Sequence, residues 1–195
     1  MKKNLPNLLT LLNLSCGSLA LVFALKGNWQ VAVVLMLSAA LLDFADGGLA
    51  RLLDAGSELG KQLDSLADLV TFGVLPAVFI YQILEQKLSY PVASGIALPG
   101  WLAYTPLVLV PAFSAIRLAR FNLEEGGGGF FRGLATPAHA LFWAGLYSAL
   151  MKTGMLFGTE MNTWLLFALV LLMASLMLVP VPMYSFKFRN FALKG

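Results

Sequence analysis

The chain has 195 residues, of which 59% are hydrophobic and only 12% are charged, and its mean hydropathy is +0.80. A soluble domain carries about twice that charged fraction, so the composition excludes an ordinary soluble globular protein. The net charge of +3 does not indicate nucleic-acid binding, and we expect no nucleic-acid partner.

Six long uncharged runs follow one another along the chain. A membrane-spanning helix needs about 20 apolar residues, and roughly 17 to 25 are tolerated. Four of the runs reach that length, and the other two do so only if their helices also carry the aspartates that border them. We therefore expect an all-α integral membrane protein with six transmembrane helices in one domain, residues 1–195. The runs are Asn4–Leu25, Gly27–Leu42, Leu69–Leu84, Leu88–Ile116, Gly133–Met151 and Met161–Phe186.

The N-terminus allows two interpretations. Basic residues before an apolar run imitate a secretory signal, and Leu14-Ser15-Cys16 imitates a lipoprotein cleavage site. Because the apolar run continues through Leu19–Leu25, we favour a retained first helix. Cys16 is the single cysteine, which excludes an internal disulfide and a cysteine-based metal cluster.

Glycine and proline residues predict the interruptions between and within the helices. Residues 54–57, Asp-Ala-Gly-Ser, predict a short break between the second and third helices. Pro76 predicts a local bend in the third helix. We expect the fourth span at about Leu98–Leu118, after an external hairpin. The glycines Gly126–Gly129 predict a cytoplasmic loop, which is either a plain spacer or a lid.

Lysine and arginine residues indicate the orientation in the membrane. With six spans, ten of them fall on one side and three on the other, and the richer side is the cytoplasmic one. We therefore expect a prokaryotic cytoplasmic membrane protein whose two termini and aspartates face the cytoplasm. The ten are Lys2, Lys3, Arg51, Lys61, Arg117, Arg120, Arg132, Lys187, Arg189 and Lys194, and the three are Lys26, Lys87 and Lys152.

Four aspartates occur within one 26-residue stretch, Asp43, Asp46, Asp64 and Asp68. The first two are three residues apart and the last two are four apart, so each helical pair projects from one face. Helix caps would not recur at these spacings. Four carboxylates that converge in an apolar setting are costly unless a cation binds them. The stretch therefore predicts a site for divalent metal, Mg²⁺ or Mn²⁺, with two ions.

Small and basic residues complete the pattern D-x2-D-G-x2-A-R-x8-G-x3-D-x3-D. Gly47 and Gly60 leave out a Cβ that would block a metal ion or a phosphate. Ala50 allows close helix approach. Arg51 offers a planar guanidinium to a phosphate, and two metal ions suit a pyrophosphate-bearing substrate.

At all eight fixed positions the pattern matches the signature of the CDP-alcohol phosphotransferase family, a family of integral membrane enzymes that this chain resembles. Other segments resemble its phosphatidylserine synthase branch. One departure is Ala135, where that branch usually has proline. The matching segments are residues 5–10, 64–73, 114–122, 133–138 and 185–188.

The resemblance implies six transmembrane helices, a homodimer and a polar cavity that faces the cytoplasm. It also implies site residues. All four aspartates match metal ligands, and Asp68 matches the general base as well. The positions implied for the CDP-lipid are Asn7, Thr10, Gly47, Ala50, Arg51, Ser57 and Gly60.

The reaction implied by the resemblance transfers a phosphatidyl group from CDP-diacylglycerol to L-serine, which gives phosphatidylserine and CMP. One alternative keeps the family and changes the acceptor to glycerol 3-phosphate, inositol phosphate or another alcohol. The other alternative is a cation channel or transporter. A phosphate-binding Arg51 beside the carboxylates disfavours it, because a cation pathway gains nothing from such a group.

Three arginines are candidates for acceptor binding. Arg117 and Arg120 lie three residues apart at the cytoplasmic end of the fourth helix, so we expect them to face one direction. They are either ordinary positive-inside residues or ligands for the acceptor's carboxylate. Arg132 is a further candidate, and the sequence assigns no role to His139.

Overall fold

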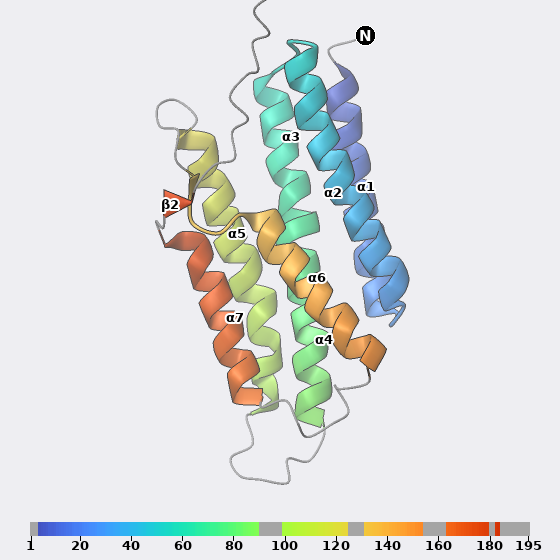
Figure 1. Cartoon of the computed structure of the whole chain (residues 1–195), viewed down its shortest axis with the longest axis vertical. Helices are drawn as coiled ribbons and strands as arrows, with labels where there is room; N and C mark the ends of the chain where they lie inside the picture. Colours follow the sequence, from blue (N-terminus) through green and yellow to red (C-terminus); the bar gives the residue numbers. More distant parts are fainter. Residues whose placement is uncertain (1–3, 90–98, 125–130, 154–162, 180–181, 184–195) are drawn as a thin grey trace, which may run out of the picture.

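The structure, a computed structural model, describes residues 4–89, 99–124, 131–153, 163–179 and 182–183. Helices make up nearly all of this part of the chain (Figure 1). The α-helices are α1 (Leu5–Leu25), α2 (Trp29–Leu52), α3 (Glu58–Asp68), α4 (Leu75–Ser89), α5 (Thr105–Glu124), α6 (Thr136–Thr153) and α7 (Thr163–Leu178). The other elements are a π-helix η2 (Leu69–Val74), a 3₁₀-helix η3 (Gly100–Tyr104) and the short strands β1 (Phe131–Arg132) and β2 (Pro182–Met183).

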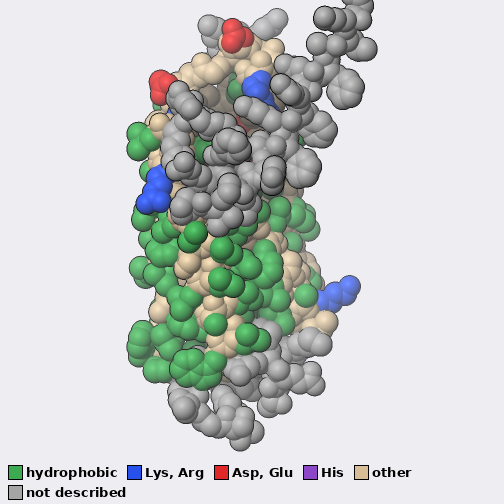
Figure 2. Space-filling view, turned by 60° about the vertical axis from the view of Figure 1, so that its left-hand side comes forward, with side chains coloured by type: hydrophobic (Ala, Val, Ile, Leu, Met, Phe, Trp, Pro, Cys, Tyr) green, Lys and Arg blue, Asp and Glu red, His purple; other side chains and the backbone are tan. Residues whose placement is uncertain are grey.

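The elements form six helical rods, since η2 joins α3 to α4 and η3 leads into α5. The prediction of an all-α membrane protein with six helices is confirmed. Four rods are long and apolar enough to cross a membrane: Leu5–Leu25, Trp29–Leu52, Glu58–Leu88 and Gly100–Leu123. Figure 2 shows hydrophobic side chains over the middle and lower part of the face in view, while most of the charged side chains in view lie toward its upper end.

Small residues let α1 and α2 pack closely. Ala20 and Ala24 are buried on α1, and Ala32 and Ala39 are buried on α2. Without bulky side chains two helices approach each other at short distance, which is how membrane helices gain packing contacts. The close packing of α1 against α2 fixes the position of the helix that carries Asp43 and Asp46 near its C-terminal end.

Away from the aspartates, a stacked aromatic pair lies next to a half-buried glutamine, Gln82. Phe79 and Tyr147 stack with their ring centroids 4.6 Å apart. The hydroxyl of Tyr147 donates to Oε1 of Gln82 at 2.6 Å, and Nε2 of Gln82 donates to the Ala24 carbonyl at 2.7 Å. Because both polar ends of Gln82 are satisfied, the side chain ties α1, α4 and α6 together in the apolar interior.

The third rod is irregular next to the predicted bend. Pro76 lies in the first turn of α4, and η2 precedes that helix directly. Proline has no amide hydrogen to donate, so it stands where the hydrogen-bond pattern changes from π to α. The break predicted at residues 54–57 is confirmed, because α2 ends at Leu52 and α3 begins at Glu58.

A tight turn fixes where α6 begins. Strands β1 and β2 pair antiparallel, with Phe131 opposite Met183. Gly133 follows with φ of +82°, and a Cβ there would lie 2.7 Å from the Met177 carbonyl oxygen. Only glycine fits this left-handed turn against α7. The Gly126–Gly129 loop and the external hairpin before residue 99 fall outside the described residues, and α5 continues to Glu124, beyond the predicted span.

Candidate active site

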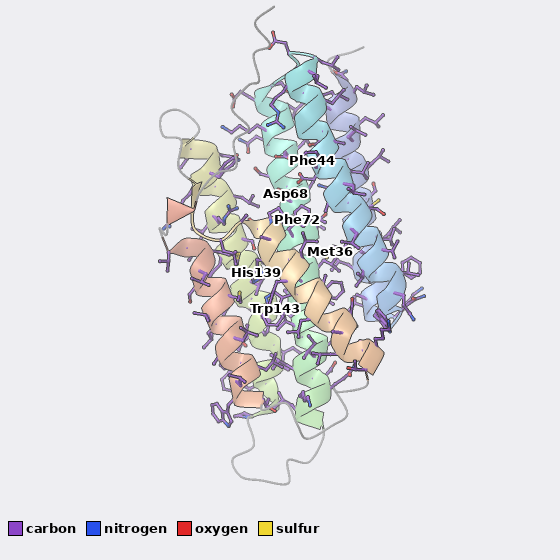
Figure 3. The ribbon with its side chains drawn as sticks, viewed as in Figure 1. Met36, Phe44, Asp68, Phe72, His139 and Trp143 are labelled. Atoms are coloured by element: carbon purple, nitrogen blue, oxygen red, sulfur yellow. The ribbon has the colours of Figure 1, made fainter. Side chains whose placement is uncertain are left out.

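Three of the four aspartates meet between α2 and α3. Carboxylate oxygens of Asp43, Asp64 and Asp68 all lie within 4.8 Å of one another. Asp68 is only 8% exposed and lies in the same half of the bundle as the α2–α3 connection, above His139 in the view of Figure 3. The helical spacing of each pair, three residues on α2 and four on α3, therefore brings carboxylates from both helices to one place.

The donor set fits a divalent cation such as Mg²⁺ or Mn²⁺. All three groups offer hard carboxylate oxygens, which these ions prefer. Oδ1 of Asp68 is buried, and no described residue donates a hydrogen bond to it. Because like charges at this distance repel in a setting with little water, a bound cation removes an electrostatic cost that the side chains alone do not.

The fourth aspartate is held by helix α1. Asp46 is 5% exposed, and its Oδ2 accepts a hydrogen bond of 2.6 Å from the hydroxyl of Thr10. Thr10 is itself buried, so this bond fixes the direction of the carboxylate. A carboxylate has a second oxygen, and Asp46 therefore keeps the capacity to bind a metal ion while Thr10 holds the first.

The start of α3 lies against α1 beside the aspartates. Ser57 caps the helix, since its Oγ accepts from the amide of Gly60 at 3.0 Å. A Cβ at Gly60 would lie 2.8 Å from Oδ1 of Asn7 and 3.1 Å from Oγ of Ser57. Glycine at this position leaves room for the Asn7 side chain in its present place against the helix N-terminus, where amide groups favour an anion.

The last turns of α2 carry the other predicted phosphate-side residues. Gly47 is exposed, and a Cβ built on it would have no neighbour within 4 Å. Ala50 is half-buried, and Arg51 is exposed in the final turn. Gly47 follows Asp43 by one helical turn, and Ala50 follows Asp46 likewise. The open space beside the aspartates is therefore bordered by small residues and one guanidinium group.

The structure separates the candidate arginines. Arg117 is half-buried, its Nη1 donates to Thr136 Oγ1 at 2.7 Å, and its charge interacts with that of Asp68. Its buried Nε has no partner among the described residues. Arg120 is exposed, so the two do not share one environment as the spacing predicted. Arg132 lies in β1, and its side chain is outside the described part of the structure.

Two hydrogen bonds near the site were not anticipated from the sequence. Asn13 Oδ1 accepts from the Thr71 hydroxyl at 2.9 Å, which joins α1 to η2. Asn122 Nδ2 donates to Ser65 Oγ at 2.8 Å, which joins α5 to α3. The one sequence feature that pointed to the first bond was a polar residue, Asn13, in an apolar run one turn after Thr10. Spacing alone does not name the partner on another helix.

His139 is also placed by the structure. It is fully buried on α6, and its Nε2 accepts from Nε1 of Trp143 at 3.0 Å. The neutral ring therefore carries its hydrogen on Nδ1, which is buried and has no partner among the described residues. Thr136, the partner of Arg117, precedes His139 by one turn on the same helix.

The sequence is similar to those of known membrane enzymes. A relative from Mycobacterium leprae named CDP-diacylglycerol–serine O-phosphatidyltransferase is 36% identical over 186 residues, which cover 92% of this chain and 57% of that protein. An archaetidylserine synthase from Methanothermobacter thermautotrophicus is 36% identical over 154 residues, 75% of this chain and 60% of that protein. A Bacillus subtilis CDP-diacylglycerol–serine O-phosphatidyltransferase is 35% identical over 133 residues, 68% of this chain and 69% of that protein.

The chain thus spans a little over half the length of the Mycobacterium leprae relative. The sequence profile for CDP-alcohol phosphatidyltransferases matches residues 3–182, which include every described helix. That match covers the four aspartates, the glycines between them and the arginines on α2 and α5. The chain therefore belongs to the CDP-alcohol phosphatidyltransferase family.

Proposed function

We propose that this protein transfers the phosphatidyl group of CDP-diacylglycerol to the hydroxyl of L-serine, which gives phosphatidylserine and CMP. The observation that carries the proposal is the meeting of carboxylate oxygens from Asp43, Asp64 and Asp68, which come from two helices, within 4.8 Å of one another. The names of the relatives support serine as the acceptor. Release of CMP on addition of serine tests the proposal, as the Discussion describes.

The CDP-lipid is proposed to bind at the open end of the triad. Arg51 supplies a guanidinium to the diphosphate, and the absence of side chains at Gly47 lets a phosphate approach the α2 backbone. The capped N-terminus of α3 at Ser57 offers amide groups of favourable polarity. Asn7 lies against that N-terminus, next to Gly60, and is proposed to contact the nucleotide.

The metal ions are proposed to bind to all four aspartates, Asp43, Asp46, Asp64 and Asp68. When bound, two divalent ions would polarise the lipid-side phosphorus and offset the negative charge that develops on CMP. The protein's own contribution is to hold the carboxylates in advance, through the helical pairs and the bond from Thr10 to Asp46.

Asp68 is proposed to act as the general base. Its Oδ1 is buried and free of described partners, so it is able to accept the proton of the serine hydroxyl. The hydroxyl oxygen forms a bond to the lipid-side phosphorus, and the bond from that phosphorus to the CMP oxygen breaks. The proton passes to Asp68 and later leaves to solvent, while CMP carries away the electron pair.

Arg117 is proposed to hold the serine carboxylate. Its buried Nε has no partner among the described residues, and the hydrogen bond to Thr136 fixes the direction of the guanidinium. A carboxylate bound there stays apart from the diphosphate, which leaves the serine hydroxyl free to face the phosphorus. Arg120 is exposed and Arg132 precedes α6, so both remain weaker candidates for the same task.

Arg117→Lys is expected to raise the KM for serine several-fold and to change the KM for CDP-diacylglycerol little. Lysine keeps the charge but lacks the planar fork that binds a carboxylate through two hydrogen bonds. Steady-state kinetics with each substrate varied in turn measure both constants, and Arg120→Lys is the comparison. An unchanged serine KM in Arg117→Lys would contradict the assignment, and a rise in Arg120→Lys alone would transfer it to Arg120.

Gly60→Ala is expected to raise the KM for CDP-diacylglycerol several-fold while the serine KM stays close to normal. The added Cβ would lie 2.8 Å from Oδ1 of Asn7, so that side chain is displaced from the helix N-terminus. Gly145→Ala on α6 is a matched control, because a Cβ there has no neighbour within 4 Å. Equal CDP-diacylglycerol constants in both variants would remove the α3 N-terminus from the lipid site.

The protein is further proposed to be a homodimer in a prokaryotic cytoplasmic membrane, in contact with membrane lipids. The asymmetry of lysine and arginine supports a cytoplasmic active site and cytoplasmic termini, ten residues against three. Serine and CMP are water-soluble, whereas CDP-diacylglycerol resides in the bilayer. A site at the cytoplasmic end of a membrane bundle is where these substrates meet.

A further inference from the structure

Helix α1 carries two buried polar side chains that form hydrogen bonds with the two rods that carry the aspartates. Thr10 is 4% exposed and Asn13 is fully buried. The Thr10 hydroxyl donates to Asp46 on α2 at 2.6 Å, and Asn13 accepts from Thr71 on η2 at 2.9 Å. Because Thr10 and Asn13 are three residues apart on one helix, they lie on the same face. This face of α1 therefore links the two rods that carry the aspartates.

Thr71 lies in the π-helical turn that directly follows Asp68. The π-helix η2 begins with the residue after Asp68, and Thr71 is its third residue. A π turn contains more residues than an α turn, so it rotates the side chains that follow relative to those before it, and such turns are frequent at functional sites. The hydrogen bond that fixes Thr71 therefore also restricts the π-helical turn that follows Asp68, the last residue of α3.

The π segment is tightly enclosed from both sides. A Cβ on Gly17 of α1 would lie 2.2 Å from the Thr71 hydroxyl oxygen and 3.2 Å from the Thr71 Cα. A Cβ on Gly73 would lie 3.1 Å from Cβ of Ser114 on α5. A side chain at position 17 would clash, and one at position 73 would be tightly packed, so α1 and α5 enclose η2 from two directions.

The Asn13–Thr71 pair is a costly way to fill this space. Nδ2 of Asn13 is buried and has no partner among the described residues. A buried amide that lacks a hydrogen bond destabilises the folded protein, because the amide has lost its hydrogen bonds to water. Two apolar side chains of similar shape avoid this cost. Stability alone therefore does not explain an amide at this position.

We propose that Thr10 and Asn13 are positioning residues of the metal site. Thr10 orients Asp46, and Asn13 orients Asp68 through Thr71. Hydrogen-bond partners of metal ligands restrict the ligands to a binding geometry, and their loss typically weakens metal binding by about 10- to 100-fold. The inference rests on the proposed function, since it requires that the aspartates bind divalent metal, and it gives Thr10 a role other than nucleotide contact.

The test measures Mn²⁺ affinity in the purified, detergent-solubilised protein without nucleotide. Thr10→Val keeps the shape and removes the donor, so Mn²⁺ is expected to bind about tenfold more weakly or worse. Thr10→Ser restores the hydroxyl and is expected to restore affinity. Ser15→Ala is the matched control, because Ser15 is exposed on α1 and, among the described residues, forms a hydrogen bond only with the Leu11 carbonyl. The metal concentration for half-maximal activity should follow the binding data, with the serine KM unchanged.

The double variant Asn13→Leu/Thr71→Val separates positioning from stability. It removes both partners and leaves no polar atom unpaired, so the melting temperature is expected to stay the same or rise. Mn²⁺ affinity is nevertheless expected to fall about tenfold. Normal affinity in this variant, or a protein that no longer folds, would overturn the role of Asn13, since the pair would then be dispensable or structural.

Asp43→Ala distinguishes failure of this inference from failure of the proposed function. If Thr10→Val binds Mn²⁺ normally while Asp43→Ala does not bind it, the positioning role of Thr10 is wrong and the metal site stands. If Asp43→Ala also binds Mn²⁺ normally, the metal site itself is wrong. Both variants are judged folded by their elution as a single species and by a cooperative thermal transition.

Discussion

Alanine at Asp43, Asp46 or Asp64 is expected to reduce turnover by at least about a hundredfold and to leave the protein folded in the membrane. Each carboxylate is proposed to bind catalytic metal, and a Lewis acid stabilises the charge of a phosphoryl-transfer transition state by several kcal/mol. For Asp43 and Asp64, folding is expected to survive because the triad oxygens lie within 4.8 Å of one another, so removing one of these carboxylates lowers their mutual repulsion.

Thermal unfolding with and without Mn²⁺ separates metal loss from misfolding. A ligand at a hundred times its Kd stabilises the folded state by about 2.7 kcal/mol, so Mn²⁺ should raise the melting temperature of the unmodified protein but not of these variants. Glu58→Gln is the control, because Glu58 is an exposed acidic residue at the start of α3. Three variants with near-normal turnover at saturating Mg²⁺ would show that the site is assigned to the wrong residues.

Asp68→Asn is expected to lower turnover by about 10²- to 10⁴-fold while CDP-diacylglycerol still binds. The amide keeps an oxygen for the metal and nearly the same volume, but it cannot take the proton from serine. The buried, unpartnered Oδ1 of Asp68 is the atom that loses this capacity. Single-turnover rates measure the chemical step, and equilibrium binding of CDP-diacylglycerol in detergent measures the ground state.

Asp64→Ala is the comparison for this experiment, since it removes a metal ligand without being the proposed base. It should weaken Mn²⁺ binding strongly, whereas Asp68→Asn should weaken it less. If Asp68→Asn turned over at a rate close to that of the unmodified protein, Asp68 would be a metal ligand only and another group would have to accept the serine proton.

The sequence was sufficient to predict the helical rods and the meeting of three of the four aspartates. The uncharged runs of membrane-spanning length predicted the rods, because the thickness of the bilayer sets the length of an apolar helix that crosses it. The spacing of Asp64 and Asp68 placed both on one helical face, and the break at residues 54–57 placed α2 and α3 next to each other. These are local regularities, and the structure confirms that carboxylates from both helices meet.

The hydrogen bonds that orient the site could not be predicted in the same way. The π-helix η2 depends on contacts with α1 and α5, such as the approach of Gly17 to Thr71, which no local pattern records. The different environments of Arg117 and Arg120 likewise depend on where α6 places Thr136. Helical spacing says which residues share a face, but tertiary packing decides which of them has a partner.

The most direct measurement is CMP release by the purified protein from labelled CDP-diacylglycerol in detergent, with Mg²⁺ or Mn²⁺ and one candidate alcohol at a time. The alcohols are L-serine, glycerol 3-phosphate and inositol phosphate, and chelation of the metal is the control. A lipid product that retains the labelled phosphatidyl group accounts for the other half of the reaction.

We expect CMP and phosphatidylserine in equal amounts with L-serine, no comparable release with the other alcohols, and loss of the reaction when metal is removed. Release with glycerol 3-phosphate or inositol phosphate but not serine would contradict the proposed acceptor and the role of Arg117. No CMP release with any of these alcohols and either metal would contradict the proposed phosphatidyltransferase activity as a whole.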